Sequence, residues 1–192
     1  MLSSEKSQPT CLTFIHLLRC FPEGGDAPKE ILALMDRANA RPDDEWIRMA
    51  IDHEARVGRK DLTRAWRLME VAKMRGIPLS PKTFTKLAKF IQTSANFKMF
   101  LEKMDEFDVE PSAKSFEIMV KYRRNTPNDW RLRTKMFQVW TKRFGMRPSD
   151  EFRREVEERL GRKRRGYNKS DEIDVFLPVY EAWLSKNNLK WG

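Results

Sequence analysis

The sequence predicts an all-α protein built as an α-solenoid, with about four to five helical hairpins in a row and a divergent C-terminal capping unit. Of its 192 residues 34% are charged, 40% are apolar and only 8 are Gly, a balance that favours helices with hydrated outer faces over a sheet. Aromatic residues open apolar-periodic segments at intervals of 32 to 38 residues. Regular repetition at this period is typical of stacked repeats, which favours the array over its alternative, a globular helical bundle.

Three regions are expected along the chain. Residues 1–11 are polar and are predicted to form a flexible N-terminus, residues 12–151 hold the repeats, and residues 152–192 form the divergent cap. A mitochondrial transit peptide would be rich in Arg and free of acids, yet Glu5 precedes the first arginine, Arg19. Any targeting signal is therefore expected to be weak or absent from this sequence. No apolar run approaches the roughly 18 residues that span a membrane, so no membrane association is expected.

Each repeat is predicted to contain a first helix that an aromatic residue opens and a second helix with its own apolar stripe. The opening aromatics are Phe14, Trp46, Phe84, Phe116 and Phe152. A turn with a proline precedes the last four, and a Ser, Thr or Asp beside it supplies a helix N-cap. Neither helix of a hairpin can bury its stripe alone, so neighbouring units are expected to share one continuous core.

The best-preserved second helix lies between Gly58 and Ser80. Its apolar residues follow helical spacing on one face: Leu62, Ala65, Trp66, Met69 and Ala72. It ends in Arg75-Gly76-Ile77-Pro78, where a cation, a glycine able to adopt positive φ and a helix breaker stop the helix.

The last unit departs from this pattern. Its first helix is predicted from Phe152 to Leu160, followed by a long basic loop, GRKRRGYNKSDE, and a final helix with apolar residues between Val175 and Leu184. Pro178 is expected in the first turn of that helix, because a proline in a helix interior costs about 3 kcal/mol. Terminal repeats commonly diverge because they cap an exposed core, which is the role we expect for this unit.

Positive charge is concentrated near the C-terminal end of the array. The net charge is +10, and residues 121–165 alone hold 16 Lys and Arg against 6 Asp and Glu. A concentrated excess of this kind favours a polyanionic partner, with phosphate contacts predicted at Arg123, Arg124, Arg131, Arg133, Lys142, Arg143, Arg153, Arg154, Arg162, Lys163, Arg164 and Arg165. The run 162–165 also resembles a nuclear localisation signal, which is the alternative reading of that cluster. Tyr122 and Tyr167 lie among these cations and are candidates for stacking on unpaired bases, with packing as the alternative.

The repeats resemble pentatricopeptide repeats, the 35-residue helical hairpins of organellar RNA-binding proteins. Thr13-Phe14, Thr83-Phe84 and Ser115-Phe116 match the opening of that family's repeat, and Ala65-Trp66-Arg67-Leu68-Met69 matches its middle. The ending is matched by Gly76-Ile77, by Asp108-Val109-Glu110-Pro111 and by Gly145-Met146-Arg147-Pro148. The resemblance covers roughly residues 12–160. The rival tetratricopeptide repeat would carry a Trp and Gly-Tyr signature that is absent from the sequence.

In that family a repeat reads one base with the residue after the opening aromatic and with the last residue of the repeat. The first position corresponds here to Ile15, Ile47, Thr85, Glu117 and Arg153, and the last to Asp43, Ser80, Ser112 and Ser149. Only Thr85 with Ser112 comes near the family's reading pairs, so these two are the candidate base contacts. Readout along several successive bases is not expected.

The chain is poor in groups that carry catalysis. His16 and His53 lie in separate repeats without ligand spacing, and Gly24-Gly25 lacks the pattern of a phosphate-binding loop. Cys11 and Cys20 are expected to be reduced packing residues. We therefore expect a protein that is not an enzyme and that has no metal, cofactor or small-molecule substrate.

The resemblance implies a non-catalytic helical protein of the mitochondrial matrix that binds RNA. Short length, basicity and a weak base code favour a structural component of a ribonucleoprotein. The mitochondrial ribosome is the leading candidate, with ribosomal RNA and neighbouring subunits as partners. The alternatives are a free, transcript-specific RNA processing or stability factor, and a protein–protein scaffold.

Overall fold

The computed structural model describes residues 9–22, 26–58, 61–110, 112–121, 130–145, 147–164 and 173–189. Over these ranges the protein is all-helical and has no strand, as predicted. The elements are α1 (Cys11–Cys20), α2 (Ala27–Arg37), α3 (Asp44–Gly58), α4 (Thr63–Met74), α5 (Pro81–Leu87), the 3₁₀ turn η1 (Ala88–Phe90), α6 (Ser94–Glu106), α7 (Ala113–Lys121), α8 (Trp130–Gln138), the π-helical turn η2 (Val139–Arg143), α9 (Asp150–Arg164) and α10 (Ile173–Lys186).

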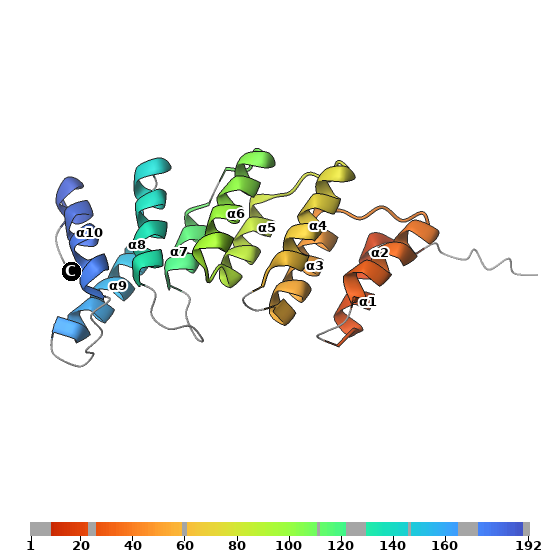
Figure 1. Cartoon of the computed structure of the whole chain (residues 1–192), viewed down its shortest axis with the longest axis horizontal. Helices are drawn as coiled ribbons and strands as arrows, with labels where there is room; N and C mark the ends of the chain where they lie inside the picture. The colour runs from red at the N-terminus through yellow and green to blue at the C-terminus, as the bar shows by residue number, and fades with distance from the viewer. Residues whose placement is uncertain are drawn as a thin grey trace, which may run out of the picture.

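The helices follow one another in chain order along the long axis of the molecule, from α1 at one end to α10 at the other (Figure 1). The odd-numbered helices pack in series, α1 on α3, α3 on α5, α5 on α7 and α7 on α9. Among the even-numbered helices, α2 packs on α1, α4 on α3, α8 on α7, and α10 on α8. Contacts are therefore made between neighbours along the chain, and the two ends lie far apart.

One hydrophobic core runs through the array, from Phe14 in α1 to Leu184 in α10. All five aromatic residues predicted to open the first helices are buried in it, as are the stripe residues of α4. Burial of this apolar surface is the main favourable contribution to folding, and it requires the neighbouring helices because each helix covers only part of the next.

The odd and even helices begin and end with recurring local signals. The residue before each odd helix is Thr, Asp or Ser, the types preferred at an N-cap: Thr10, Asp43, Ser80, Ser112 and Ser149. A residue with positive φ follows each even helix or its terminal turn, at Asn39, Gly76, Asp108, Gly145 and Asn188. After α2, α4, α6 and α10 the amide of the residue that follows the positive-φ residue donates to the carbonyl five residues earlier, as Ile77 N does to Ala72 O at 2.9 Å. The predicted stop at Gly76 is confirmed.

The C-terminal unit differs from its prediction in two places. Helix α9 continues to Arg164, so Gly161 to Arg164 are helical and do not belong to a loop; residues 165–172 of the predicted loop lie outside the described residues. Pro178 is inside α10, five residues after its first residue, and not in its first turn.

Both cysteines are free, but Cys20 is exposed, so the prediction that it packs is wrong. Burial, together with a hydrogen bond to Asp43, raises the pKa of the partly buried Cys11 thiol to about 11.

Residues 1–8 of the predicted flexible N-terminus lie outside the described residues. No helix in the described ranges is long and apolar enough to cross a bilayer.

Candidate nucleic-acid interface

The residues predicted to contact phosphate fall into three groups in the structure. Arg131, Lys142, Arg143 and Arg154 are exposed, whereas Arg153 is half-buried and Arg133 is only 3% exposed. Arg162, Lys163 and Arg164 lie at the end of α9, without a described side-chain position. Arg123, Arg124 and Arg165, and the two stacking candidates Tyr122 and Tyr167, lie outside the described residues.

Three of these arginines are paired with carboxylates or buried. Arg143 donates to both carboxylate oxygens of Asp105, at 3.0 and 2.9 Å, and its guanidinium lies 5.0 Å from the ring centre of Phe144. Arg153 pairs with Asp150 at 3.2 Å and lies 3.9 Å from a Glu157 oxygen. Arg133 is buried in α8. Arg133 is therefore not part of an exposed basic surface, and Arg143 and Arg153 contribute to it only together with their carboxylates.

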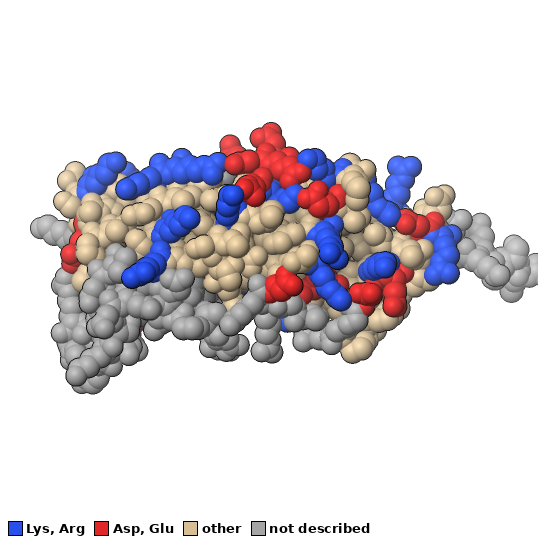
Figure 2. Space-filling model, viewed as in Figure 1, with Lys and Arg blue, Asp and Glu red and all other residues tan. Residues whose placement is uncertain are grey.

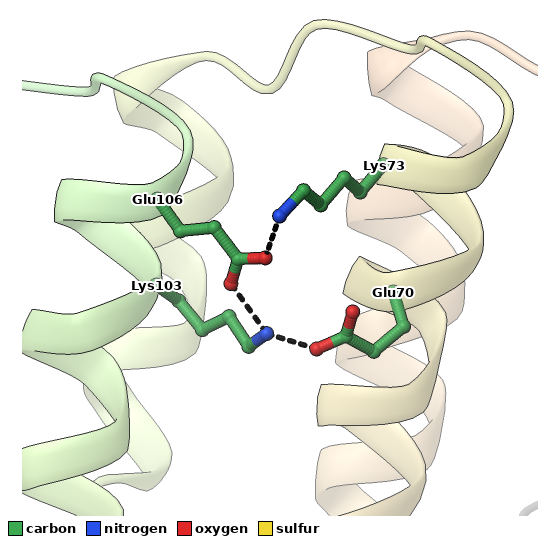
Figure 3. Close-up of polar contacts among 4 residues, drawn as sticks. All are labelled: Glu70, Lys73, Lys103 and Glu106. Atoms are coloured by element: carbon green, nitrogen blue, oxygen red, sulfur yellow. Dashed lines mark hydrogen bonds and ion pairs between the residues drawn. The ribbon is translucent and has the colours of Figure 1, made fainter.

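Charged side chains connect the even-numbered helices. Arg75, just after α4, donates to both oxygens of Asp36 in α2, at 2.7 and 2.8 Å. Between α4 and α6, Glu106 pairs with Lys73 and also accepts from Lys103 at 2.6 Å, and Lys103 in turn pairs with Glu70 (Figure 3). Arg143 then joins η2 to α6 through Asp105. Positive charge is thus balanced by a carboxylate at each of these three junctions.

The last junction, between α8 and α10, is different. Lys142 at the end of η2, Arg147 just beyond it and Lys186 at the end of α10 line one groove of about 490 Å³. Its lining contains no Asp or Glu, and within the described part of the chain none of these three cations makes an ion pair. In Figure 2 Lys and Arg gather over this end of the upper edge, while Asp and Glu gather over the ends of the helices in the middle. Among the described junctions, the positive charge that no carboxylate balances is therefore concentrated between α8 and α10.

Aromatic and aliphatic side chains form the rest of the groove, with Phe137 on one wall and Pro178, Val179 and Trp183 on the other. The rings of Phe137 and Trp183 meet edge to face, with centroids 5.7 Å apart. Trp183 also stacks against Tyr180, with centroids 5.9 Å apart, and Tyr180 in turn contacts Phe137 at 5.7 Å. These contacts hold the indole at a fixed angle, and the groove combines a rigid aromatic surface with three cations.

Arg147 and Lys186 were missed by the sequence-based choice of residues. Lys186 lies outside the basic segment 121–165, and Arg147 belongs to the segment that matches a repeat ending. A detectable signal did exist, because Lys186 occupies the last turn of an even helix, where the earlier junctions carry their charged side chains. Comparison of helix ends, in place of counting charge along the chain, would have found it.

The candidate base contacts Thr85 and Ser112 are brought together. Their hydroxyl oxygens lie 3.1 Å apart, and each is also within 2.9 Å of Ser115 Oγ. Thr85 also donates to the carbonyl of Pro81 at 2.9 Å. The two residues thus share a site between α5 and α7, where their hydroxyls hydrogen-bond within the protein.

The other positions corresponding to base readers do not offer a second site. Ile15 and Ile47 are buried, and Glu117 is buried and accepts a hydrogen bond from the amide of Ser149 at 3.0 Å. The hydrogen bond of Glu117 joins α7 to the residue before α9. The absence of an extended base code stays a prediction.

Within the described residues there is no group of three or more His, Cys, Asp or Glu side chains placed to hold a metal ion. His53 lies 3.3 Å from the carbonyl oxygen of Pro22, and burial raises the pKa of the neighbouring Glu54 above its ordinary value, partly offset by Arg64. In comparisons with known proteins, no protein-family model matches this chain and no curated protein matches it.

Proposed function

We propose that this protein is a non-catalytic RNA-binding component of a ribonucleoprotein, which contacts the sugar–phosphate backbone through the basic C-terminal end of a helical-repeat array. The observation that carries the proposal is the α8–α10 junction. There Lys142, Arg147 and Lys186 line a groove to which the described residues contribute no carboxylate, whereas the three earlier junctions are neutralised by ion pairs. Cations that lack acidic neighbours are available to phosphates, and the counterions that phosphates release favour binding.

We also propose that the ten described helices form five hairpins of a pentatricopeptide-like α-solenoid, with α9 and α10 as the divergent cap. The serial packing of the odd helices, the recurring Ser, Thr or Asp before each of them and the recurring positive φ after each even helix support this description. Each feature recurs once per hairpin, as expected when one structural unit is repeated.

Binding through the backbone is preferred over readout of base sequence. Of the positions that correspond to base readers, Thr85 and Ser112 alone have suitable chemistry, and their hydroxyls already bond to each other and to Ser115. One such site would give little sequence discrimination. The protein should therefore bind single-stranded RNAs of different sequence with similar affinity and with a steep dependence on salt.

The cellular setting rests on the resemblance to organellar repeat proteins. We propose the mitochondrial matrix and, because the array is short and its base code weak, a structural place in the mitochondrial ribosome beside ribosomal RNA and other subunits. Sedimentation of the tagged protein with ribosomal subunits on a gradient is the expected result. Sedimentation apart from both subunits would reject the ribosomal assignment and favour the free transcript-specific factor.

Charge reversal tests the RNA interface directly. A triple variant with Lys142→Glu, Arg147→Glu and Lys186→Glu should lose about 100-fold or more in affinity for a mixed-sequence, single-stranded 20-nucleotide RNA at physiological salt. The matched control reverses three exposed lysines elsewhere, Lys29→Glu, Lys82→Glu and Lys89→Glu, and has the same net charge. Its loss should be about fivefold or less.

Equal losses in the two triple variants would mean that RNA responds only to net charge, and the α8–α10 end would not be the interface. Absence of RNA binding by the wild-type protein, together with retention of a protein partner by both variants, would favour the protein–protein scaffold.

A further inference from the structure

We propose that the groove between α8 and α10 is a site for one unpaired nucleotide, with the base against Trp183 and its phosphates at Lys142, Arg147 and Lys186. The inference rests on the proposed function and makes it more specific, since backbone binding alone requires no groove. It places the site on the even-helix side of the cap, away from Thr85 and Ser112.

The groove has the size and lining of a small-molecule site. Its volume of about 490 Å³ falls within the range of roughly 300–1,000 Å³ that is common for ligand pockets. The exposed apolar surface comes from the half-buried Val179 and Trp183 on α10, with the fully buried Phe137 of α8 beneath them. The rim is polar and includes the amides of Gln138 and Asn187. An apolar floor with a few polar groups at its edge suits a flat heterocycle that carries a charged group.

Local backbone irregularities shape both walls. On the first wall η2 is a π-helical turn, with a hydrogen bond from Phe144 N to Val139 O at 3.4 Å, and Thr141 Oγ1 donates to the carbonyl of Phe137 at 2.8 Å. Extra residues in a helical turn are frequent at functional sites, because they change the direction of the side chains that follow. Here the turn ends at Lys142 and Arg143, of which the first lines the groove and the second joins α6. On the second wall Pro178 lies inside α10 and also lines the groove.

Charge and shape together identify the occupant. The three cations, with no carboxylate among the described lining residues, select an anion, and Trp183, packed against Phe137 and Tyr180, provides the kind of aromatic surface on which unpaired bases stack. Every base has a flat π-face, so such a site would tolerate all four bases, in agreement with the absence of a base code. A double helix keeps its bases stacked inside and would offer only phosphates to this groove.

The test introduces a carboxylate into the groove without disturbing the core. Ala182 is exposed and lines the groove, so Ala182→Glu should fold normally. Ala33→Glu on α2 is the matched control, with the same chemical change at an exposed helical position far along the array. Affinities of the wild type and both variants are measured for one single-stranded 12-nucleotide RNA and for its duplex, with circular dichroism to verify folding.

We expect Ala182→Glu to weaken single-strand binding at least tenfold and duplex binding by a clearly smaller factor, because the new carboxylate repels the phosphates of both RNAs but only the single strand also loses its base site. Ala33→Glu should change neither beyond threefold. As an independent readout, a single-stranded RNA that carries one 5-iodouridine should crosslink to the tryptic peptide containing Trp183. Equal loss for single strand and duplex, or no loss beyond the control, would overturn the nucleotide site and leave backbone binding intact. Crosslinks found only on other peptides would also overturn it.

If the wild type binds neither RNA, the proposed function itself fails. Tighter binding of an acidic peptide at the groove would then replace the nucleotide with a protein partner.

Discussion

Thr83 Oγ1 donates a hydrogen bond of 2.6 Å to Asp44 Oδ1 and so connects the beginning of α5 to the beginning of α3. Thr83 is fully buried, and the same carboxylate accepts from Ser80 through its amide at 2.9 Å and its hydroxyl at 2.6 Å. One acidic side chain therefore satisfies three donors from the beginning of α5. This contact fixes how α5 packs on α3, because the donors belong to the turn that leads into α5 and to its first residues.

Asp44→Ala should lower the free energy of unfolding by about 1–3 kcal/mol, since it leaves a buried hydroxyl and an amide without their acceptor. Urea denaturation at pH 7, followed by circular dichroism, measures the loss. Asp36→Ala is the control, because it removes the carboxylate of a solvent-exposed ion pair with Arg75 and should cost only about 0–1 kcal/mol. A cost for Asp44→Ala no larger than that of the control would show that the contact between α3 and α5 contributes little to stability.

The stabilisation by Asp44 should also depend on pH. Burial alone would raise the pKa of Asp44, but the hydrogen bonds from Ser80 and Thr83 outweigh it and hold the pKa below its ordinary value. A carboxyl whose pKa is lower in the folded state contributes stability above its unfolded pKa, about 3.9, and loses that contribution as the pH falls through the folded value. The stability difference between wild type and Asp44→Asn should thus be constant from pH 7 to 5 and shrink toward pH 3. A difference that grew on acidification would contradict the assignment.

Lys103 should matter more than Lys73, although both belong to the same ion network between α4 and α6 (Figure 3). Burial would lower the pKa of Lys103, but its hydrogen bonds with Glu106 and Glu70 outweigh burial and raise it. The residue is only 7% exposed, so Lys103→Ala should cost about 1–3 kcal/mol. The exposed Lys73, replaced by Ala, should cost about 0–1 kcal/mol. Chemical denaturation of the two variants under identical salt decides between this order and its reverse.

Where a helix end depends on local chemistry, it could be predicted from the sequence. Gly76 ends α4 because it adopts a positive φ, and Ser80 precedes α5 as a cap residue followed by a proline. The buried aromatics were predictable for the same reason, since their spacing places them on one face of each helix. These features depend on residues within one helical turn.

The role of each cation depended on contacts that sequence spacing does not give. Arg143 and Lys142 are adjacent in sequence and equally charged, yet Arg143 pairs with Asp105, 38 residues earlier, while Lys142 lines the groove. Arg133 was predicted to lie on the surface but points into the packed side of α8. The extension of α9 to Arg164 was missed because the predicted boundary was placed at Gly161, a weak helix former that tertiary structure tolerates.

Pro178→Ala should stabilise the protein. Pro178 lies inside α10, where it removes the hydrogen bond to the carbonyl of residue 174 and crowds that carbonyl. Its side chain is exposed, so the replacement loses little packing, and we expect a gain of about 1–3 kcal/mol in the free energy of unfolding. Thermal and urea denaturation measure the gain, with Ala182→Gly on the same helix as a control that should lose about 1 kcal/mol. A loss on Pro178→Ala would mean that the proline is needed for the packing of α10 on α8.

The salt dependence of RNA binding should report which lysines contact phosphate. For single-stranded RNA the slope of log K against log salt concentration changes by about 0.7 for each phosphate contact. Lys142→Gln and Lys186→Gln should each make the slope shallower by about that amount, because both residues line the carboxylate-free groove. Lys29→Gln removes an equal charge from the exposed face of α2, remote from the groove, and should leave the slope unchanged. Affinities measured between roughly 50 and 300 mM salt give all three slopes. A uniform change in the three variants would assign the effect to net charge, whereas a change confined to Lys142 and Lys186 assigns it to contacts at the α8–α10 junction.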